Sequence, residues 1–291
     1  MTAKTLMAFG HSHLSALMRA YKELEAHEPP DGWRAEFVWL GDKTLQPNFE
    51  LIGKGKVKSA RQDGPGPYQA ITARLRSPGA EELAKGDKVR ALSQTVEDHM
   101  RARLDEGKPD AILLACMGNE YNSLGLLQHP EPFDFDLPGS GLPVEEGVAY
   151  IQYSAMKAQL RAIAERNVLL FWRFFNDVAG DVPIYLVPPP PPIASEEHIL
   201  SYPGAFADRA KSAGISPVAL RRKLWMLYLE ILRDATHDTA TRLVDLPEVI
   251  FTDGCLSRQF WKQDPTHGNS DYGMIILDHV TEQAFAAELE S

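Results

Sequence analysis

Four polar residues of the chain have the types and spacing that nucleophilic catalysis by a serine requires. Ser12 can supply the hydroxyl, and His267 can take its proton, because an unperturbed imidazole titrates near neutral pH. Asp264, three residues before His267, can orient the imidazole through its other nitrogen. The side-chain amide of Asn119 and the backbone N–H of Ser12 can donate hydrogen bonds to an oxyanion.

The predicted secondary structure brings these residues to one edge of a sheet. Residues 6–9 form a short apolar run of strand length, Ser12 follows it, and apolar residues then recur at helical spacing. Asn119 follows the continuous apolar run 110–117, which is typical of a strand buried on both faces. Asp264 and His267 follow the last predicted strand. Because the loops after parallel strands emerge at the same end of a sheet, we expect the four side chains to lie close together.

The remaining chain alternates predicted strands with predicted helices. Further strands are expected at 35–40, 182–187 and 242–246, and helices at 81–106, 148–178, 216–234 and 271–289. Such alternation predicts an α/β fold in which a mostly parallel sheet of five strands is covered by helices on both faces. Gly41, directly after the second strand, offers one more backbone donor for an oxyanion.

No linker divides the chain, so we expect one domain over residues 1–291. Residues 42–80 show no clear period and read as a long insertion loop over the sheet edge. The five prolines from Pro188 to Pro192 cannot continue a central strand, so they predict a rigid, extended surface segment leaving the sheet.

The net charge of −10 argues against nucleic acids and anionic membranes as partners. No signal peptide and no apolar run near ~20 residues is found, so the sequence predicts a cytoplasmic protein. Cys116 and Cys255 are then expected to be reduced.

These motifs resemble those of the SGNH hydrolases, also called GDSL-type esterases and lipases. The best match is Asp264-Pro265-Thr266-His267, which resembles the Asp-x-x-His of that family. Gly10 and Ser12 match the Gly-Asp-Ser block, with His11 in place of its Asp. Asn119 matches the Asn of a Gly-x-Asn-Asp block, in which Met117 replaces the Gly and Glu120 the final Asp.

The resemblance implies a three-layer α/β/α fold and a serine ester hydrolase with the triad Ser12, His267 and Asp264. Its oxyanion hole would comprise Ser12, Gly41 and Asn119, with His11 and Glu120 expected to bind substrate. The expected substrate is a small acyl ester, with an O-acetylated carbohydrate as the first suggestion. No cofactor and no metal are expected.

Several alternatives remain open on the sequence alone. Ser12 can simply cap the following helix. The same site can transfer its acyl group to a sugar hydroxyl instead of water, or the scaffold can bind a ligand without catalysis. His11 and His13, two residues apart, can instead form a metal pair of a metal-dependent hydrolase.

Overall fold

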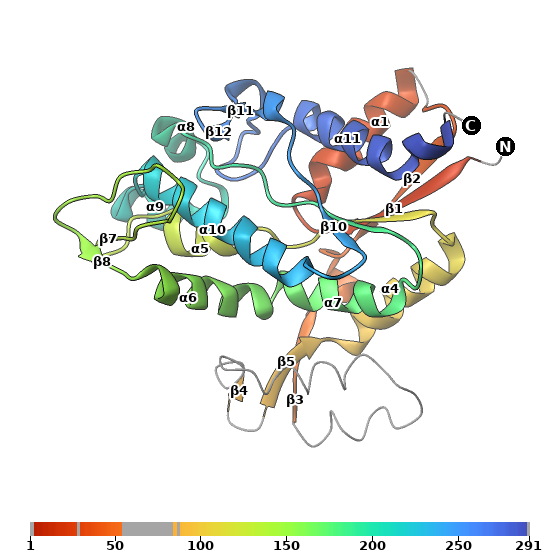
Figure 1. The fold of residues 1–291 in the computed structure, drawn as a ribbon, viewed down its shortest axis with the longest axis horizontal. Helices are drawn as coiled ribbons and strands as arrows, with labels where there is room; N and C mark the ends of the chain where they lie inside the picture. The colour runs from red at the N-terminus through yellow and green to blue at the C-terminus, as the bar shows by residue number, and fades with distance from the viewer. Residues whose placement is uncertain (1–2, 28–29, 54–83, 86–87, 290–291) are drawn as a thin grey trace.

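The computed structural model of the chain describes residues 3–27, 30–53, 84–85 and 88–289. A five-stranded sheet with all its strands parallel lies at the centre (Figure 1). Its strands are β1 Lys4–Gly10, β2 Trp33–Trp39, β6 Ala111–Ala115, β9 Ile184–Leu186 and β10 Thr241–Leu243. They lie in the order β10-β9-β6-β1-β2. The direction of winding therefore reverses between β1 and β6, and such a switch point is where open α/β sheets bind ligands.

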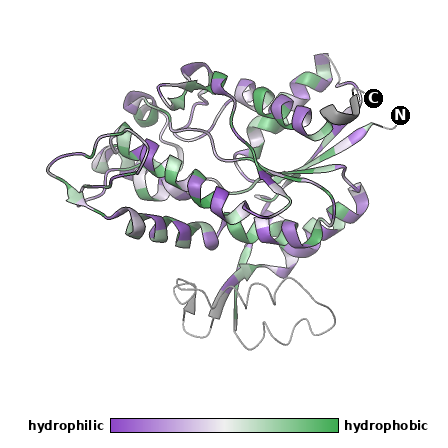
Figure 2. Ribbon diagram, in the orientation of Figure 1, coloured by the Kyte–Doolittle hydropathy of each residue, from purple (hydrophilic) through white to green (hydrophobic). Residues whose placement is uncertain are grey.

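Helices cover both faces of this sheet. Helices α1 Leu14–His27 and α11 Ser270–Leu289 pack on one face, and α4 Gln94–Gly107, α7 Val168–Val178 and α10 Val218–Thr236 belong to the layer on the other (Figure 1). Purple and green residues alternate along these helices, as amphipathic helices require (Figure 2). The predicted three-layer α/β/α fold with a five-stranded parallel sheet is confirmed.

Strand β1 divides the core because its side chains alternate between the two faces. Met7 and Phe9 join the cluster under α4 and α7, whereas Leu6 and Ala8 join the cluster under α1 and α11. All four are fully buried. A strand with apolar residues on both faces has no solvent side, which explains its continuous apolar run.

The prediction of one helix over 81–106 is wrong in its first half. Residues Lys88–Leu92 form strand β5, and the helix α4 begins only at Gln94. Strand β5 pairs antiparallel with β3, Phe49–Gly53, and with β4, Ala84–Lys85. The pairing partner β3 comes from about 40 residues earlier, so a local hydrophobic period cannot indicate it. Of the predicted loop at 42–80, residues 42–53 contain a 3₁₀ turn, Lys43–Leu45, and β3, and the rest lies outside the described residues.

The predicted helix at 148–178 is two helices, α6 Tyr153–Glu165 and α7. Asn167 interrupts them with a non-helical backbone (φ −131°, ψ −99°). Its side-chain amide donates to the carbonyl of Ile163 at 2.9 Å. In a continuous helix that carbonyl would accept from the backbone N–H of Asn167, so the side chain replaces a backbone hydrogen bond at the end of α6.

The five prolines are buried, which corrects the prediction of a surface segment. Their carbonyl groups accept hydrogen bonds from three donors: the Tyr121 hydroxyl to Pro190 at 3.1 Å, the Trp225 indole to Pro189 at 3.1 Å and the Leu256 N–H to Pro192 at 3.0 Å. A proline run needs no partner for its own nitrogens, and these three donors satisfy the carbonyl groups of Pro189, Pro190 and Pro192. The proline run is therefore an internal segment that follows β9.

Apart from α6 and the 3₁₀ turns Gly204–Phe206, Glu248–Ile250 and Arg258–Phe260, the remaining described elements are short and lie beyond the carboxyl ends of the central strands. They are α5 Glu120–Gly125, α8 Glu196–Ser201, α9 Ala207–Ala213, and the small strands β7 Phe133–Asp134, β8 Ala149–Tyr150, β11 Phe251–Thr252 and β12 Cys255–Leu256. The fully buried Lys223 ammonium of α10 pairs with Asp134 at 2.5 Å and fixes the loop after β7. Within the described residues, no helix is long and apolar enough to cross a membrane.

Candidate active site

Ser12 lies in the turn between β1 and α1, as the sequence predicts. Its carbonyl accepts hydrogen bonds from the N–H of Ser15 at 3.2 Å and from the Ser15 hydroxyl at 2.7 Å. Its own hydroxyl makes no hydrogen bond to any described residue, so it does not cap α1. The alternative role of Ser12 as a simple helix cap therefore disagrees with the structure, and the hydroxyl stays free to react.

Ser12 faces a pocket of about 460 Å³ at the switch point of the sheet. Residues from the loops after β1, β2 and β6 meet there with residues from α5 and the α6–α7 junction. The pocket is lined by His11, Ser12, Trp39, Gly41, Met117, Asn119, Glu120, Ser123, Ile163 and Asn167. Its volume falls within the ~300–1,000 Å³ of ordinary small-molecule sites. All three predicted oxyanion residues and both predicted substrate-binding residues thus line one pocket.

The donors expected for an oxyanion are unoccupied. Neither the backbone N–H of Ser12 nor that of Gly41 donates a hydrogen bond to a described residue. The Asn119 side chain is oriented by Asn122, whose amide nitrogen donates to Asn119 Oδ1 at 3.1 Å. Asn119 Nδ2 is therefore directed away from Asn122 and is free to donate. Preorganised donors of this kind need no rearrangement when negative charge develops.

The carboxylate of Glu120 binds protein groups around the loop that carries Asn119 and is not free to bind a ligand in the pocket. Its carboxylate is buried and accepts from the Gly118 N–H at 2.9 Å, the Tyr228 hydroxyl at 3.0 Å and the Val168 N–H at 3.3 Å. Burial raises the pKa of the Glu120 carboxyl, and these hydrogen bonds oppose that effect. The same burial, together with the nearby Glu120, raises the pKa of Tyr228 well above its usual value.

Asp264 and His267 form the predicted pair. His267 Nδ1 lies 2.9 Å from both carboxylate oxygens of Asp264, and Asp264 also accepts from the N–H groups of Thr266 and His267 at 2.9 and 2.8 Å. Burial alone would raise the pKa of the Asp264 carboxyl, but these hydrogen bonds and the imidazole hold it well below its usual range. With the Nδ1 proton on the carboxylate side, Nε2 of the neutral imidazole carries the lone pair of a base.

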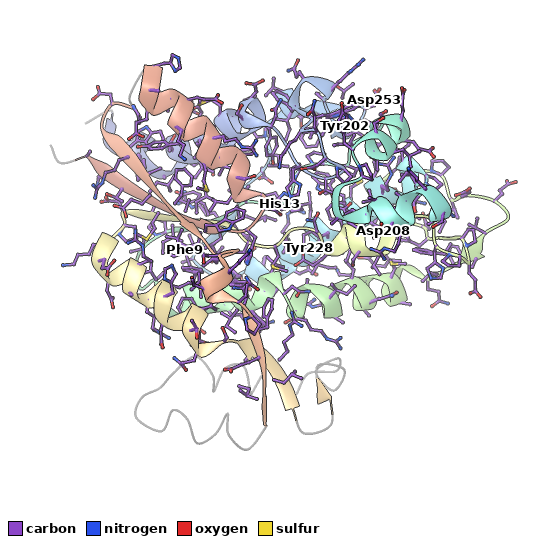
Figure 3. All side chains as sticks on the ribbon, turned by 180° about the vertical axis from the view of Figure 1, so that it is seen from behind. Phe9, His13, Tyr202, Asp208, Tyr228 and Asp253 are labelled. Carbon is purple, nitrogen blue, oxygen red and sulfur yellow. The ribbon has the colours of Figure 1, made fainter. Side chains whose placement is uncertain are left out.

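No hydrogen bond joins the proposed base and nucleophile in the described structure, and neither His267 nor Asp264 is among the residues that line the pocket. His267 Nε2 is buried without a hydrogen-bond partner among the described residues. The ring of His267 instead stacks on His13, the residue after Ser12, with 4.5 Å between ring centroids and 37° between planes. Figure 3 labels His13 in the middle of the molecule, at the start of α1. The structure thus places His267 against the residue that follows Ser12.

The contact of His13 with His267 was missed by sequence reasoning, which considered His13 as half of a metal pair. Its side chain is buried, and both of its nitrogens lack a partner in the described structure. Gly118 lies against its ring, where a Cβ at position 118 would come within 2.6 Å. Burial first, and the neighbouring His267 imidazole second, lower the pKa of His13 well below 6.5, so the His13 imidazole is neutral at pH 7.

The alternative metal pair has no support in this geometry. Both ring nitrogens of His11 bond to protein atoms, one to the N–H of Met117 at 3.2 Å and one to Asn48 Oδ1 at 3.1 Å. Nor does any group of three or more His, Cys, Asp or Glu side chains in the described parts of the chain have the arrangement of a metal site.

No protein-family model and no curated protein matches this chain. Three solved structures are similar to it over nearly its whole length. A GDSL-like lipase from Bacteroides thetaiotaomicron VPI-5482 has a TM-score of 0.40 and 11% identity, covering 98% of this chain and 89% of its own. The periplasmic domain of a lipopolysaccharide acetyltransferase from Salmonella ser. Paratyphi A has a TM-score of 0.43 and 10% identity, covering 97% and 83%. TesA has a TM-score of 0.37 and 10% identity, covering 97% and 99%.

Proposed function

We propose that this chain is a serine ester hydrolase of the SGNH type that cleaves a small acyl ester through an acyl-enzyme on Ser12. The observation that carries the proposal is the pocket in which an unbonded serine hydroxyl meets three unoccupied hydrogen-bond donors. A capping or structural serine needs none of those donors.

In the proposed reaction, Ser12 Oγ attacks the ester carbonyl carbon and its proton passes to His267 Nε2. The carbonyl oxygen becomes an oxyanion, which the N–H groups of Ser12 and Gly41 and the Asn119 amide stabilise. The bond to the alcohol then breaks, and the alcohol leaves with the proton from His267. Water attacks the acyl-enzyme in the same way, with His267 again taking and returning a proton, and the carboxylic acid is released.

This mechanism requires a contact between Ser12 and His267 that is absent from the ligand-free structure. A buried nitrogen without a partner is costly, by about 1–3 kcal/mol. Pairing Ser12 Oγ with His267 Nε2 would remove that cost. Catalytic hydrogen bonds often tighten only when substrate is bound. Asp264 keeps Nε2 as the acceptor during that displacement, because it holds the proton on Nδ1.

The apolar side chains of the pocket suggest where the acyl group binds. Trp39, Met117 and Ile163 line it beside the donors. An acyl chain can lie against them with its carbonyl oxygen at the donors, and the alcohol would then point toward solvent. This arrangement serves an acetylated carbohydrate as well as a longer acyl ester, so the acyl chain is the part that we expect the pocket to discriminate.

A fluorophosphonate probe tests the proposal, because it phosphonylates only an activated serine. We expect stoichiometric labelling of the wild-type protein, none of Ser12→Ala, and unchanged labelling of Ser15→Ala, the neighbouring serine of α1. Tandem mass spectrometry of the labelled tryptic peptide 5–19 identifies the modified residue, because this peptide contains both Ser12 and Ser15. Equal labelling of wild type and Ser12→Ala, or no labelling of either, would reject the proposed nucleophile and favour a binding protein on this scaffold.

A further inference from the structure

His11 lies where three loops of the pocket meet. Its backbone N–H donates to the carbonyl of Ala115, the last residue of β6, at 3.2 Å. Its ring bonds on one side to the N–H of Met117, in the loop after β6, and on the other to Asn48, in the segment after β2. His11 itself belongs to the loop after β1. The same three loops carry Ser12, Gly41 and Asn119.

The hydrogen bonds determine which nitrogen of His11 carries the proton. The Met117 N–H can only donate, so His11 Nδ1 is the acceptor and the proton is on Nε2. Asn48 gives the same answer independently. Its Nδ2 donates to the carbonyl groups of Leu40 at 3.0 Å and Leu45 at 3.2 Å, so its oxygen is the atom that faces His11 Nε2. The Gln46 amide also donates to this oxygen at 3.1 Å.

The Asn48 bond to Leu40 extends this link to an oxyanion donor. Leu40 immediately precedes Gly41, and the Leu40 N–H also donates to the carbonyl of Gly10 at 2.8 Å. The peptide carrying the Gly41 N–H is therefore held through its own carbonyl oxygen by Asn48, which is held in turn by His11. The hydrogen bonds thus connect His11, the residue before Ser12, through the Asn48 side chain to the peptide group that carries the Gly41 N–H.

The Met117 bond fixes a backbone that would otherwise relax. Met117 has φ +57° and Gly118 has φ +99°, so a non-glycine residue adopts the left-handed region just before Asn119. The N–H groups of these two residues point to His11 Nδ1 and to Glu120 Oε2, respectively. Both acceptors are buried or half-buried, so water does not readily replace them. Burial lowers the pKa of His11 against the raising effect of its bond to Asn48, which keeps Nδ1 an acceptor at neutral pH.

We propose that His11 is a positioning residue whose imidazole, together with Asn48, clamps the loops after β1, β2 and β6 so that the oxyanion donors face Ser12. By positioning the donors, the clamp would stabilise the transition state of the proposed ester hydrolysis, and this inference rests on that proposed function. It gives the histidine at this position a role different from substrate binding, because both of its ring nitrogens are occupied by protein atoms.

Two substitutions of His11 separate the clamp from simple packing. The His11 ring also packs edge-on against Phe171, with 5.0 Å between centroids. His11→Phe keeps a ring for that contact and loses both hydrogen bonds. His11→Gln loses the ring, yet its amide can accept from Met117 and donate to Asn48. We expect His11→Phe to lower kcat for p-nitrophenyl acetate by ~10- to 100-fold with KM within about threefold, and His11→Gln to retain at least about a third of kcat.

Packing alone predicts the opposite order, with the phenylalanine variant active and the glutamine variant impaired. That order, or an equal loss of kcat in both variants, would overturn the clamp. Asn48→Leu provides a second route if His11→Phe does not fold, and it should lower kcat without raising KM. In each variant, circular dichroism and urea unfolding establish that the protein under assay is folded.

The tautomer of His11 can be measured without an activity assay. Two-bond ¹⁵N–¹H spectra of the imidazoles should show His11 with a protonated Nε2 and an unprotonated Nδ1 in the wild-type protein. A proton on Nδ1 would contradict the clamp even in an active enzyme. Conversely, the wild-type protein could show the expected tautomer of His11 and yet not be labelled by the fluorophosphonate. That result would reject the proposed function but leave the hydrogen bonds from His11 to Asn48 and Met117 intact. The two failures are thus distinguishable.

Discussion

At the scale of single residues, Asn119 provides the sharpest test of the oxyanion hole. Asn119→Ala removes a free donor, so kcat should fall by ~10²-fold while KM changes little. Asn119→Asp is the matched variant, because it keeps an acceptor for Asn122 but places a carboxylate where negative charge develops. It should lose at least as much activity as the alanine variant. Steady-state kinetics on p-nitrophenyl acetate measures both, and a large fall in melting temperature would instead mark Asn119 as structural.

His267 is tested by the loss of the proposed base. Without an imidazole, the Ser12 proton has no buried acceptor, so His267→Ala should lower turnover by at least ~10²-fold. Asp264→Asn is informative beside it, since an amide nitrogen facing Nδ1 favours the tautomer with its proton on Nε2. That variant should also lose activity while keeping the loop geometry. A full rate in His267→Ala would remove this residue from the mechanism.

The site residues that sequence could predict are those fixed by topology. Ser12, Gly41 and Asn119 each follow a strand of one parallel sheet, and this rule alone places them together. Asn48 could not be found in the same way, because its role depends on a contact with His11, which is 37 positions away and separated from it by α1 and β2. The position of His13 against His267 is equally non-local.

At the scale of elements, helices α1 and α11 hold the two halves of the proposed triad. Ser12 lies two residues before α1, and His267 lies three residues before α11. The helices touch at Gly273, where a Cβ would come within 2.4 Å of the carbonyl oxygen of Ala16. Glycine is thus required here by close approach rather than by a turn.

Gly273→Ala should therefore push the two helices apart. Helix propensity alone would favour alanine by about 1 kcal/mol, but the collision is with backbone atoms that cannot swing away. We expect a net loss of about 1–3 kcal/mol in the free energy of unfolding, together with a lower kcat. Urea denaturation and the esterase assay measure the two effects. Asp278→Ala, on the exposed side of the same helix, is the control, and equal stability of the two variants would contradict the close contact.

Elements were predictable where their own apolar pattern fits one state, and not where a tertiary contact decides between two states. The strands of the central sheet follow from their apolar runs. The apolar residues of strand β5, Val89 and Leu92, continue the helical spacing of Val96 and Met100 in α4, so only the pairing with β3 identifies this segment as a strand. The proline run was assigned to the surface because nothing local indicates that Tyr121 and Trp225 supply its hydrogen bonds. In each case a tertiary contact decided between two states that the local sequence permits.

At the scale of the whole molecule, buried histidines link stability to pH. His13 and His11 both have pKa values lowered from 6.5 by burial, so the unfolded chain binds more protons than the folded protein at pH values between the folded pKa and about 6.5. The free energy of unfolding should therefore fall as pH falls through that window. Asp264 acts in the same direction at lower pH, because its stabilisation is lost as pH falls toward its depressed pKa. Glu120 acts in the opposite direction, since its raised pKa favours the folded state at low pH.

His13→Leu isolates one of these contributions, because the other three groups are the same in both proteins. Each depressed histidine contributes a slope of up to about 1.4 kcal/mol per pH unit inside its window. Below about pH 6.5 the wild-type protein should thus lose stability more steeply than His13→Leu, and the two curves should run parallel above it. Urea unfolding at half-unit steps from pH 5 to pH 8 measures this difference. Parallel curves over the entire range would mean that His13 keeps an ordinary pKa, and hence that its ring is not desolvated between Gly118 and His267.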